Sequence, residues 1–269
     1  RKQIFPDHRI DLTLRFRDAT SKVEEEQQES ILLIDQWCAE YENKIRSMGG
    51  IGFFLGGIGP DGHIAFNVRG SDHNSTTRLT GTNFETQAAA ATDLGGIEIS
   101  RNRLVITIGL GTITYNPDAT GIIIAAGEAK SKIIKNSLEH APDVKYPATA
   151  LAKLKKSCFY ITKGAGKLLA DFERDYWENS EWNDQKLQRS ILELSRNINV
   201  FGKKLSLDNL QNDEHCKNIP SLNADTVSDV IKKVESKVEK GSKLETNQTF
   251  YHTGPHHDDI MLGLMPYVI

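Results

Sequence analysis

The sequence lacks several features that would assign it to a class of protein at once. Its longest apolar runs, around 104–113 and 122–126, fall far short of the roughly 20 residues that a helix needs to cross a bilayer. Residues 1–7 contain no apolar core of a signal peptide. Positive charge is not concentrated, since 33 Lys and Arg face 36 Asp and Glu. Neither a membrane nor nucleic acid is therefore an expected partner.

Cysteine is also scarce. Cys38, Cys158 and Cys216 are widely separated and form neither a C-x-x-C motif nor a cluster of metal ligands. Free thiols in a reducing environment are the expected state, and we predict a cytoplasmic protein. A chain of 269 residues can nevertheless bury a full core, and it is long enough for one domain plus part of another.

Glycine, in contrast, is concentrated in one place. Residues 56–67 read Gly-Gly-Ile-Gly-Pro-Asp-Gly-His-Ile-Ala-Phe-Asn and follow an apolar run at 51–55 that predicts a strand. Glycines let the backbone approach a ligand without a Cβ in the way. Asp61 and His63 then place a carboxylate and a base that titrates near neutral pH in one turn, as acid–base catalysis needs. The alternative is an incidental His in a surface turn, which the apolar flanks disfavour.

The glycines of 57–62 also match the dinucleotide fingerprint G-x-G-x-x-G. That fingerprint requires a long helix that starts at the glycines and receives a pyrophosphate at its N-terminus. Residues 68–75 instead read Val-Arg-Gly-Ser-Asp-His-Asn-Ser, which is typical of a loop. We interpret the match as accidental.

Strand and helix patterns alternate over residues 1–164. Strands separated by helices favour an α/β fold, a Rossmann-like doubly wound parallel sheet with its ligand site beyond the carboxyl ends of the strands. An apolar stripe at steps of three and four predicts a helix that ends at Gly49 and packs against the sheet. The stripe consists of Ile31, Ile34, Cys38, Tyr41, Ile45 and Met48. The expected strands are 51–55, 103–109, 121–126 and 158–162, and further helices are expected at 86–92 and 128–139.

Lys130 is a candidate phosphate ligand. It lies just after the strand expected at 121–126, in the first turn of the helix expected at 128–139. A helix N-terminus attracts anions through its free N–H groups and its dipole. We therefore place substrate binding at Gly57, Gly59 and Lys130, with an ordinary solvated lysine as the alternative.

Part of the chain resembles the glucosamine-6-phosphate deaminase/isomerase family. The resemblance runs from about residue 31 to about 164 and is carried by 56–67, by Ser-Thr-Thr-Arg at 75–78 and by Ile-Gly-Leu-Gly-Thr at 108–112. It implies a sugar-phosphate site that converts glucosamine 6-phosphate to fructose 6-phosphate plus ammonia, with no cofactor. It also implies that Asp61 and His63 form a relay that opens the sugar ring, and that Lys130 binds the phosphate.

Three departures from the family pattern put turnover in doubt. The Glu that follows the family's catalytic His by five residues is Val68 here, so a carboxylate that polarises His63 is missing. A phosphate-binding Arg of the family falls near Thr92. The family's N-terminal third, which carries its proton-transfer Asp, has no counterpart before Gly49, so we expect negligible ammonia release from this chain alone.

Residues 165–246 are highly charged and predict helices, including one at 226–240 that ends at Gly241. We interpret this stretch as a helical linker packed on the α/β domain. A pair of partner-binding helices is the alternative.

The last residues carry a second resemblance. A strand expected at 249–254 leads into Pro-His-His-Asp-Asp at 255–259, where a His and an Asp three residues apart can bind one metal. The stretch resembles the His-Pro-Asp-Asp motif of the LmbE/PIG-L family of zinc-dependent N-acetylglucosaminyl deacetylases, with His257 in place of Pro. The resemblance implies zinc bound by His256 and Asp259, with Asp258 as general base. A His-rich turn without metal is the alternative.

Both families act on amino sugars, so we predict a piece of a fused amino-sugar enzyme. Residues 1–164 would be the deaminase-like domain without its N-terminal third, 165–246 the linker, and 247–269 the start of a deacetylase domain. The expected partner is a sugar phosphate, and a homo-oligomer is left open. Two alternatives remain. One is a non-catalytic sugar-phosphate-binding domain that serves the zinc deacetylase, and the other is a lactonase or isomerase acting on a different sugar phosphate.

Overall fold

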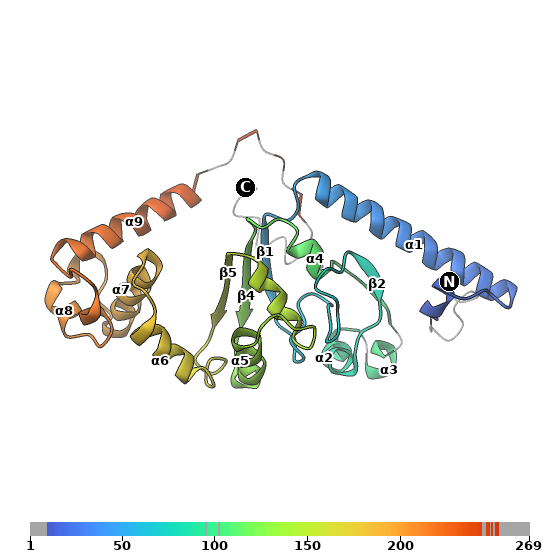
Figure 1. The fold of residues 1–269 in the computed structure, drawn as a ribbon, viewed down its shortest axis with the longest axis horizontal. Coiled ribbons are helices and arrows are strands. Elements are labelled where there is room, and N and C mark those ends of the chain that lie inside the picture. The colour runs from blue at the N-terminus through green and yellow to red at the C-terminus, as the bar shows by residue number, and fades with distance from the viewer. Residues whose placement is uncertain are drawn as a thin grey trace. The chain divides into compact units, whose positions relative to one another are not determined.

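The computed structural model describes residues 10–94, 96–101, 103–243, 246–247, 249 and 251–252 (Figure 1). Contacts divide the chain between Arg174 and Asp175 into two compact units, each of which is described by itself. The motif at 255–259, with His256, Asp258 and Asp259, lies outside the described residues and stays a prediction. No helix in the described ranges has the length and apolarity needed to cross a membrane.

The first unit is built on a three-stranded parallel sheet with the order β1-β4-β5 (Figure 1). Gly57 pairs with Ile124, and Ile124 pairs with Tyr160, so the carboxyl ends of all three strands lie side by side. The parallel α/β sheet expected from the alternating pattern is confirmed. The strands are β1 (Phe53–Gly57), β4 (Thr120–Ala125) and β5 (Lys156–Ile161).

The segment expected as a strand at 103–109 does not join this sheet. The strand within this segment, β3 (Val105–Thr107), pairs antiparallel with β2 (Arg78–Thr80) in a separate two-stranded sheet. An apolar run identifies a strand but not its neighbour, because pairing depends on contacts that are distant in sequence. The helical segment expected at 86–92 is present as α2 (Phe84–Leu94), which is followed by α3 (Ile97–Ser100).

One face of the parallel sheet is buried and the other is open. Ile123 and Ala125 point into the main core, where they pack with α4 (Leu110–Ile113), α5 (Ser131–Glu139) and the 3-10 helix η3 (Pro147–Lys153). Side chains of alternate residues leave a strand on opposite faces. The opposite face carries four large apolar side chains that are between 49% and 62% exposed, namely Phe53, Leu55, Ile124 and Tyr160.

The longest helix of the first unit, α1 (Lys22–Ser47), begins earlier than its apolar stripe indicates. Ser21 caps its N-terminus by accepting a hydrogen bond from the Glu24 backbone N–H at 3.2 Å. Val23 is the only apolar residue between Lys22 and Ser30, so the apolar stripe does not extend over the first two turns. The expected contact of α1 is with the sheet, and its main contacts in the structure are with η1 (Leu12–Arg15) and with β2 of the two-stranded sheet. Met48, the last residue of the stripe, is exposed.

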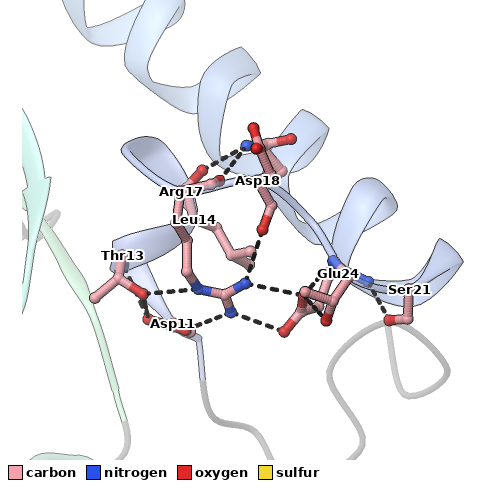
Figure 2. Close-up of polar contacts among 9 residues, drawn as sticks. Asp11, Thr13, Leu14, Arg17, Asp18, Ser21 and Glu24 are labelled. Carbon is pink, nitrogen blue, oxygen red and sulfur yellow. Dashed lines mark hydrogen bonds and ion pairs between the residues drawn. The ribbon is translucent and has the colours of Figure 1, made fainter.

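A network of ion pairs fastens η1 to the start of α1. Figure 2 shows the Arg17 guanidinium between Asp11 and Glu24, to whose carboxylates it donates at 2.9 Å and 2.7 Å. Hydrogen bonds from Thr13 and Arg17 lower the pKa of Asp11 to about 2. Those from Arg17 and Thr20 lower the pKa of Glu24 to about 2. Both carboxylates are therefore ionised at neutral pH and hold Arg17 in place.

The second unit is helical and has an apolar core of its own. Its core includes Leu194 of α7, Leu210 of α8, Cys216 of η5 and Val230 of α9. The helix expected at 226–240 is confirmed as α9, which ends at Gly241 as predicted. The helices are α6 (Ala170–Asn179), which crosses the boundary between the units, α7 (Asp184–Ile198), η4 (Gly202–Lys204), α8 (Leu207–Gln211), η5 (Cys216–Asn218) and α9 (Asp225–Gly241).

Lys186 is buried inside this helical unit, with 1% of its surface exposed. Its ammonium donates to the backbone carbonyls of Tyr176 at 2.9 Å, Trp177 at 3.1 Å and Ser180 at 2.8 Å. Those carbonyls lie at the end of α6, where backbone oxygens lack partners within the helix. The ammonium also lies 4.7 Å from the centre of the Trp182 ring, which favours a cation. Lys186 therefore ties α7 to the end of α6.

We predict that Lys186→Met lowers the free energy of unfolding of the second unit by about 1–3 kcal/mol, because three carbonyls lose a charged donor. Urea unfolding followed by tryptophan fluorescence would measure this, since Trp177 and Trp182 surround the site. Lys233→Met is the matched control, because Lys233 forms an exposed ion pair with Asp184 and should change stability by less than about 1 kcal/mol. Equal losses in the two variants would contradict the role given to Lys186.

Candidate active site

The glycine-rich loop after β1 is closed by hydrogen bonds within itself. The Gly59 N–H donates to the His63 carbonyl at 2.9 Å, and the Gly62 N–H donates to the Gly59 carbonyl at 3.0 Å. Gly62 has a φ of 87°, a conformation that side chains other than glycine disfavour. The chain then folds back, and the Arg69 N–H donates to Asp61 Oδ2 at 3.0 Å. These bonds fix the residues between Gly59 and Arg69 relative to one another.

Asp61 and His63 form a pair inside this loop. Asp61 Oδ1 lies 2.5 Å from His63 Nδ1, and the Asp61 side chain is fully buried while that of His63 is 14% exposed. Burial by itself would raise the pKa of Asp61, but hydrogen bonds from His63, the Arg69 N–H and Asn83 hold it well below its ordinary value. An ionised Asp61 can only accept, so we assign the proton of the neutral imidazole to Nδ1. Nε2 is then the nitrogen that can exchange a proton with a substrate.

This geometry answers the question raised by Val68. The sequence lacks the family's Glu at that position, and Val68 is partly buried, with its carbonyl accepting from the Ser71 N–H at 2.9 Å. His63 nevertheless contacts a carboxylate, that of Asp61. The missing Glu therefore does not leave the imidazole without a carboxylate partner, although position 68 itself supplies none. Thr92 lies in α2, but its side chain is outside the described part of the structure.

Two further residues of the site, Asn83 and Thr86, were not predicted from the sequence. Asn83 Nδ2 donates to Asp61 Oδ2 at 2.5 Å, while its Oδ1 accepts from the Thr86 backbone N–H at 3.0 Å. Thr86 Oγ1 lies 3.2 Å from His63 Nδ1. An Asn directly before a helix is a typical N-cap, and Asn83 precedes α2. That signal locates the cap, but only the folded structure places it against Asp61.

Lys130 contacts the same loop from the end of β4, the strand that neighbours β1 in the sheet. Gly127, with a φ of 86°, turns the chain after β4 into a short 3-10 helix, η2 (Glu128–Lys130), so that Lys130 is the N-cap residue of α5. The helix therefore starts three residues later than expected. Lys130 Nζ donates to the Ile58 carbonyl at 2.7 Å. Burial lowers the pKa of Lys130, and the negative charge of Asp61 opposes that effect.

The two predicted glycine ligands differ in how closely they are surrounded. A Cβ built on Gly59 would lie 1.9 Å from His63 Cε1, so the imidazole rests directly against this glycine. A Cβ on Gly57 would come no closer than 4.0 Å to the Ile124 carbonyl. The structure thus brings Asp61, His63, Gly59 and Lys130 into one loop region, with Gly57 at the end of the adjoining strand.

Within the described residues, no group of three His, Cys, Asp or Glu side chains is arranged to hold a metal ion. The predicted zinc ligands His256 and Asp259 lie outside those residues. The site described above consists of one carboxylate, one imidazole and one ammonium group. Such a set of groups can bind an anion and transfer protons.

Comparison with known proteins relates this region to amino-sugar phosphate enzymes. No protein-family model matches the chain. The chain is 34% identical over 150 residues to the glucosamine-6-phosphate deaminase of Borrelia garinii subsp. bavariensis, a match that covers 53% of this chain and 55% of that protein. It is 39% identical over 119 residues to the glucosamine-6-phosphate isomerase of Candida albicans, with 44% and 48% covered. The chain thus spans about half the length of the curated relatives it matches.

Among solved structures, a monomeric glucosamine-6-phosphate deaminase is similar at 26% identity and a TM-score of 0.45, covering 55% of this chain and 56% of that one. The resemblance of part of the chain to glucosamine-6-phosphate deaminases and isomerases is confirmed by the sequence identities. The resemblance to zinc deacetylases stays a prediction.

We predict that Gly59→Ala displaces the His63 ring, because the new Cβ would overlap the imidazole. Histidine NMR signals, assigned with a His63→Gln variant, would report a changed His63 resonance while the far-ultraviolet circular dichroism stays the same. Gly57→Ala is the matched control, since its Cβ has room. An unchanged His63 signal in Gly59→Ala would show that the ring does not rest on this glycine.

We predict that Asp61→Asn lowers the free energy of unfolding by about 1–3 kcal/mol near neutral pH, because buried donors lose an ionised acceptor. Folding lowers the pKa of Asp61 below its ordinary value of 3.8. Its contribution is therefore complete above about pH 4 and is lost as the pH falls further. The difference between the wild type and Asp61→Asn, measured by urea unfolding, should shrink below that pH.

The exposed Asp118→Asn is the control for this series and should stay within about 0.5 kcal/mol of the wild type throughout. A difference for Asp61→Asn that is constant from pH 7 to pH 3 would mean that Asp61 is not ionised in the folded protein.

Proposed function

We propose that the first unit carries the acid–base pair and a phosphate ligand of a glucosamine-6-phosphate deaminase/isomerase. The reaction is the conversion of glucosamine 6-phosphate and water to fructose 6-phosphate and ammonia. The observation that carries the proposal is the contact between a buried, ionised Asp61 and His63 Nδ1, in a glycine loop at the carboxyl ends of parallel strands. The substrate and the reaction are proposed by analogy with the deaminase and isomerase relatives, which match about half of the chain.

His63 suits the opening of the sugar ring. Ring opening removes the proton of the anomeric hydroxyl, breaks the bond between C1 and the ring oxygen, and returns a proton to that oxygen. A single base that can take and give the proton near neutral pH can perform both transfers. With Nδ1 held by Asp61, His63 Nε2 is the atom that exchanges the proton. The role of Asp61 is to fix the tautomer and to stabilise the imidazolium while it exists.

Lys130 suits the phosphate group. It is a cation at the N-terminus of α5, and free backbone N–H groups at such an end add to the attraction of an anion. Its bond to the Ile58 carbonyl holds the ammonium beside the loop that carries Asp61 and His63. A phosphate ester bound there would place the sugar next to the imidazole.

A second candidate is a sugar-phosphate-binding domain without catalysis, which would serve a zinc deacetylase. Val68 favours it, because the carboxylate that the family places there is lost. The two candidates differ in one measurement. Both require binding of glucosamine 6-phosphate, whereas only the first requires that opening of the bound sugar ring depends on His63.

We predict that Lys130→Ala weakens binding of glucosamine 6-phosphate by about 1–3 kcal/mol, the range for losing a hydrogen bond to a charged group. Titration calorimetry would measure this, and glucosamine without phosphate should bind both proteins equally. Lys132→Ala is the matched control, since Lys132 is exposed two residues further along the chain. Equal binding by Lys130→Ala and the wild type would remove Lys130 from the site.

A further inference from the structure

Glu42 is a second buried carboxylate in the first unit, and it lies on α1, away from the glycine loop. It is 5% exposed. Glu42 Oε2 accepts hydrogen bonds from Thr77 N at 3.2 Å, Thr77 Oγ1 at 3.0 Å and Thr112 Oγ1 at 2.7 Å, while Oε1 accepts from Arg46 Nε at 2.8 Å. Burial would raise the pKa of Glu42, but the bonds from Arg46 and the two threonines keep it below its ordinary value.

Glu42 thereby joins two segments that are about 35 residues apart in the sequence. The segment around Thr77 and the segment around Thr112 are in direct contact, since the Gly111 N–H donates to the Ser75 carbonyl at 2.8 Å. A Cβ on Gly109 would lie 1.9 Å from the Ser75 carbonyl oxygen. Thr112 Oγ1, which donates to Glu42, also accepts from the Gly109 N–H at 3.2 Å. The carboxylate is thus a common anchor for both segments.

Both segments make hydrogen bonds with the side chain of Asn67, which is fully buried. From the first segment, Arg78, the neighbour of Thr77, donates to Asn67 Oδ1 at 2.9 Å. From the second, the Ile108 carbonyl, next to Gly109, accepts from Asn67 Nδ2 at 2.8 Å. The same Nδ2 donates to the Ile64 carbonyl at 3.0 Å, and Ile64 follows His63 in the chain. Hydrogen bonds therefore connect Glu42 to the backbone beside His63.

The turn that Asn67 holds is strained. Ala65 has a φ of 51°, a left-handed conformation that costs a residue with a Cβ about 1–2 kcal/mol. Such a conformation persists only where surrounding bonds enforce it. The Asn67 N–H and side chain both bind the Ile64 carbonyl, at 3.1 Å and 3.0 Å. If Asn67 shifts, this turn has a lower-energy conformation available, and the backbone of His63 would move with it.

We propose that Glu42 is a positioning residue for His63, acting through Thr77, Thr112 and Asn67, without touching the imidazole or a substrate. Glu42 holds the segments around Thr77 and Thr112, and these segments position the Asn67 side chain. Asn67 in turn holds the turn after His63, so that His63 Nδ1 stays in contact with Asp61. The catalytic role of His63 rests on the proposed function. The effect of Glu42 on the His63 tautomer does not depend on which substrate binds.

The test is the tautomer of His63 in the full chain, read from the nitrogen chemical shifts of ¹⁵N-histidine-labelled protein. The wild type should show the proton on Nδ1. Glu42→Ala should lose this single tautomer, because the Nδ1 contact with Asp61 is no longer enforced. Glu42→Gln, which keeps an acceptor oxygen for the threonines, should restore most of it. Glu40→Ala, which removes an exposed carboxylate from the same helix, is the control for charge and should match the wild type.

Thr112→Val provides a second route if Glu42→Ala fails to fold. It keeps the side-chain shape but removes the hydroxyl that bridges Glu42 and Gly109, so it should shift the tautomer in the same direction. A folded Glu42→Ala protein with the wild-type tautomer would overturn the proposal. If Glu42→Ala does not fold, a folded Thr112→Val protein with the wild-type tautomer would overturn the proposal instead.

Measurements of turnover and substrate binding distinguish a failure of the Glu42 proposal from a failure of the proposed function. If ammonia release is measurable in the wild type, Glu42→Ala should lower kcat by roughly 10²-fold, the size of effect that a misplacement of about 1 Å produces. Its KM should stay within about twofold, because Lys130 is untouched. If no glucosamine 6-phosphate binds, the proposed function fails, and the tautomer measurement still decides the role of Glu42.

Discussion

A carboxylate buried away from water must have its oxygens satisfied by hydrogen-bond donors, and the site is arranged around such a group. Asp61 receives donors from three parts of the chain. These are His63 in its own loop, the backbone of Arg69 after the turn, and Asn83 at the start of α2. Each donor lowers the pKa of Asp61 and is held in place by it. The positions of the imidazole, the returning loop and α2 therefore follow from one ionised side chain.

Glu42 meets the same requirement on the other side of these loops. Its donors are hydroxyl groups, a backbone N–H and Arg46, and they come from segments that the sequence separates widely. Two buried carboxylates thus hold the segments near the site: Asp61 bonds to His63, Arg69 and Asn83, and Glu42 bonds to Thr77 and Thr112. Asn67 lies between them and makes a hydrogen bond with each of its polar side-chain atoms. A site built in this way depends on residues that a substrate never touches.

The helical unit is stabilised differently. Its apolar core comes from its own helices. The buried ammonium of Lys186 is stabilised by backbone carbonyls and an aromatic ring instead of by a carboxylate. Residues 165–246 were interpreted as a linker because charged residues dominate them and no known motif is present. Apolar side chains at positions such as Leu194, Leu210 and Val230 are few, yet together they form a continuous core.

Local chemistry was enough to predict the glycine loop, the pair of Asp61 and His63 and the parallel sheet, whereas Lys130 became a candidate through its place at a helix start together with the family resemblance. Glycine runs, helix periodicity and buried strands are properties of neighbouring residues, so the sequence displays them directly. The partner of β3, the side of α1 that is buried and the roles of Asn83, Thr86 and Glu42 were decided only by the tertiary structure. Those features depend on donors and acceptors that lie 20 to 70 residues apart in the sequence. The pattern of adjacent residues does not predict which of these distant groups will form hydrogen bonds.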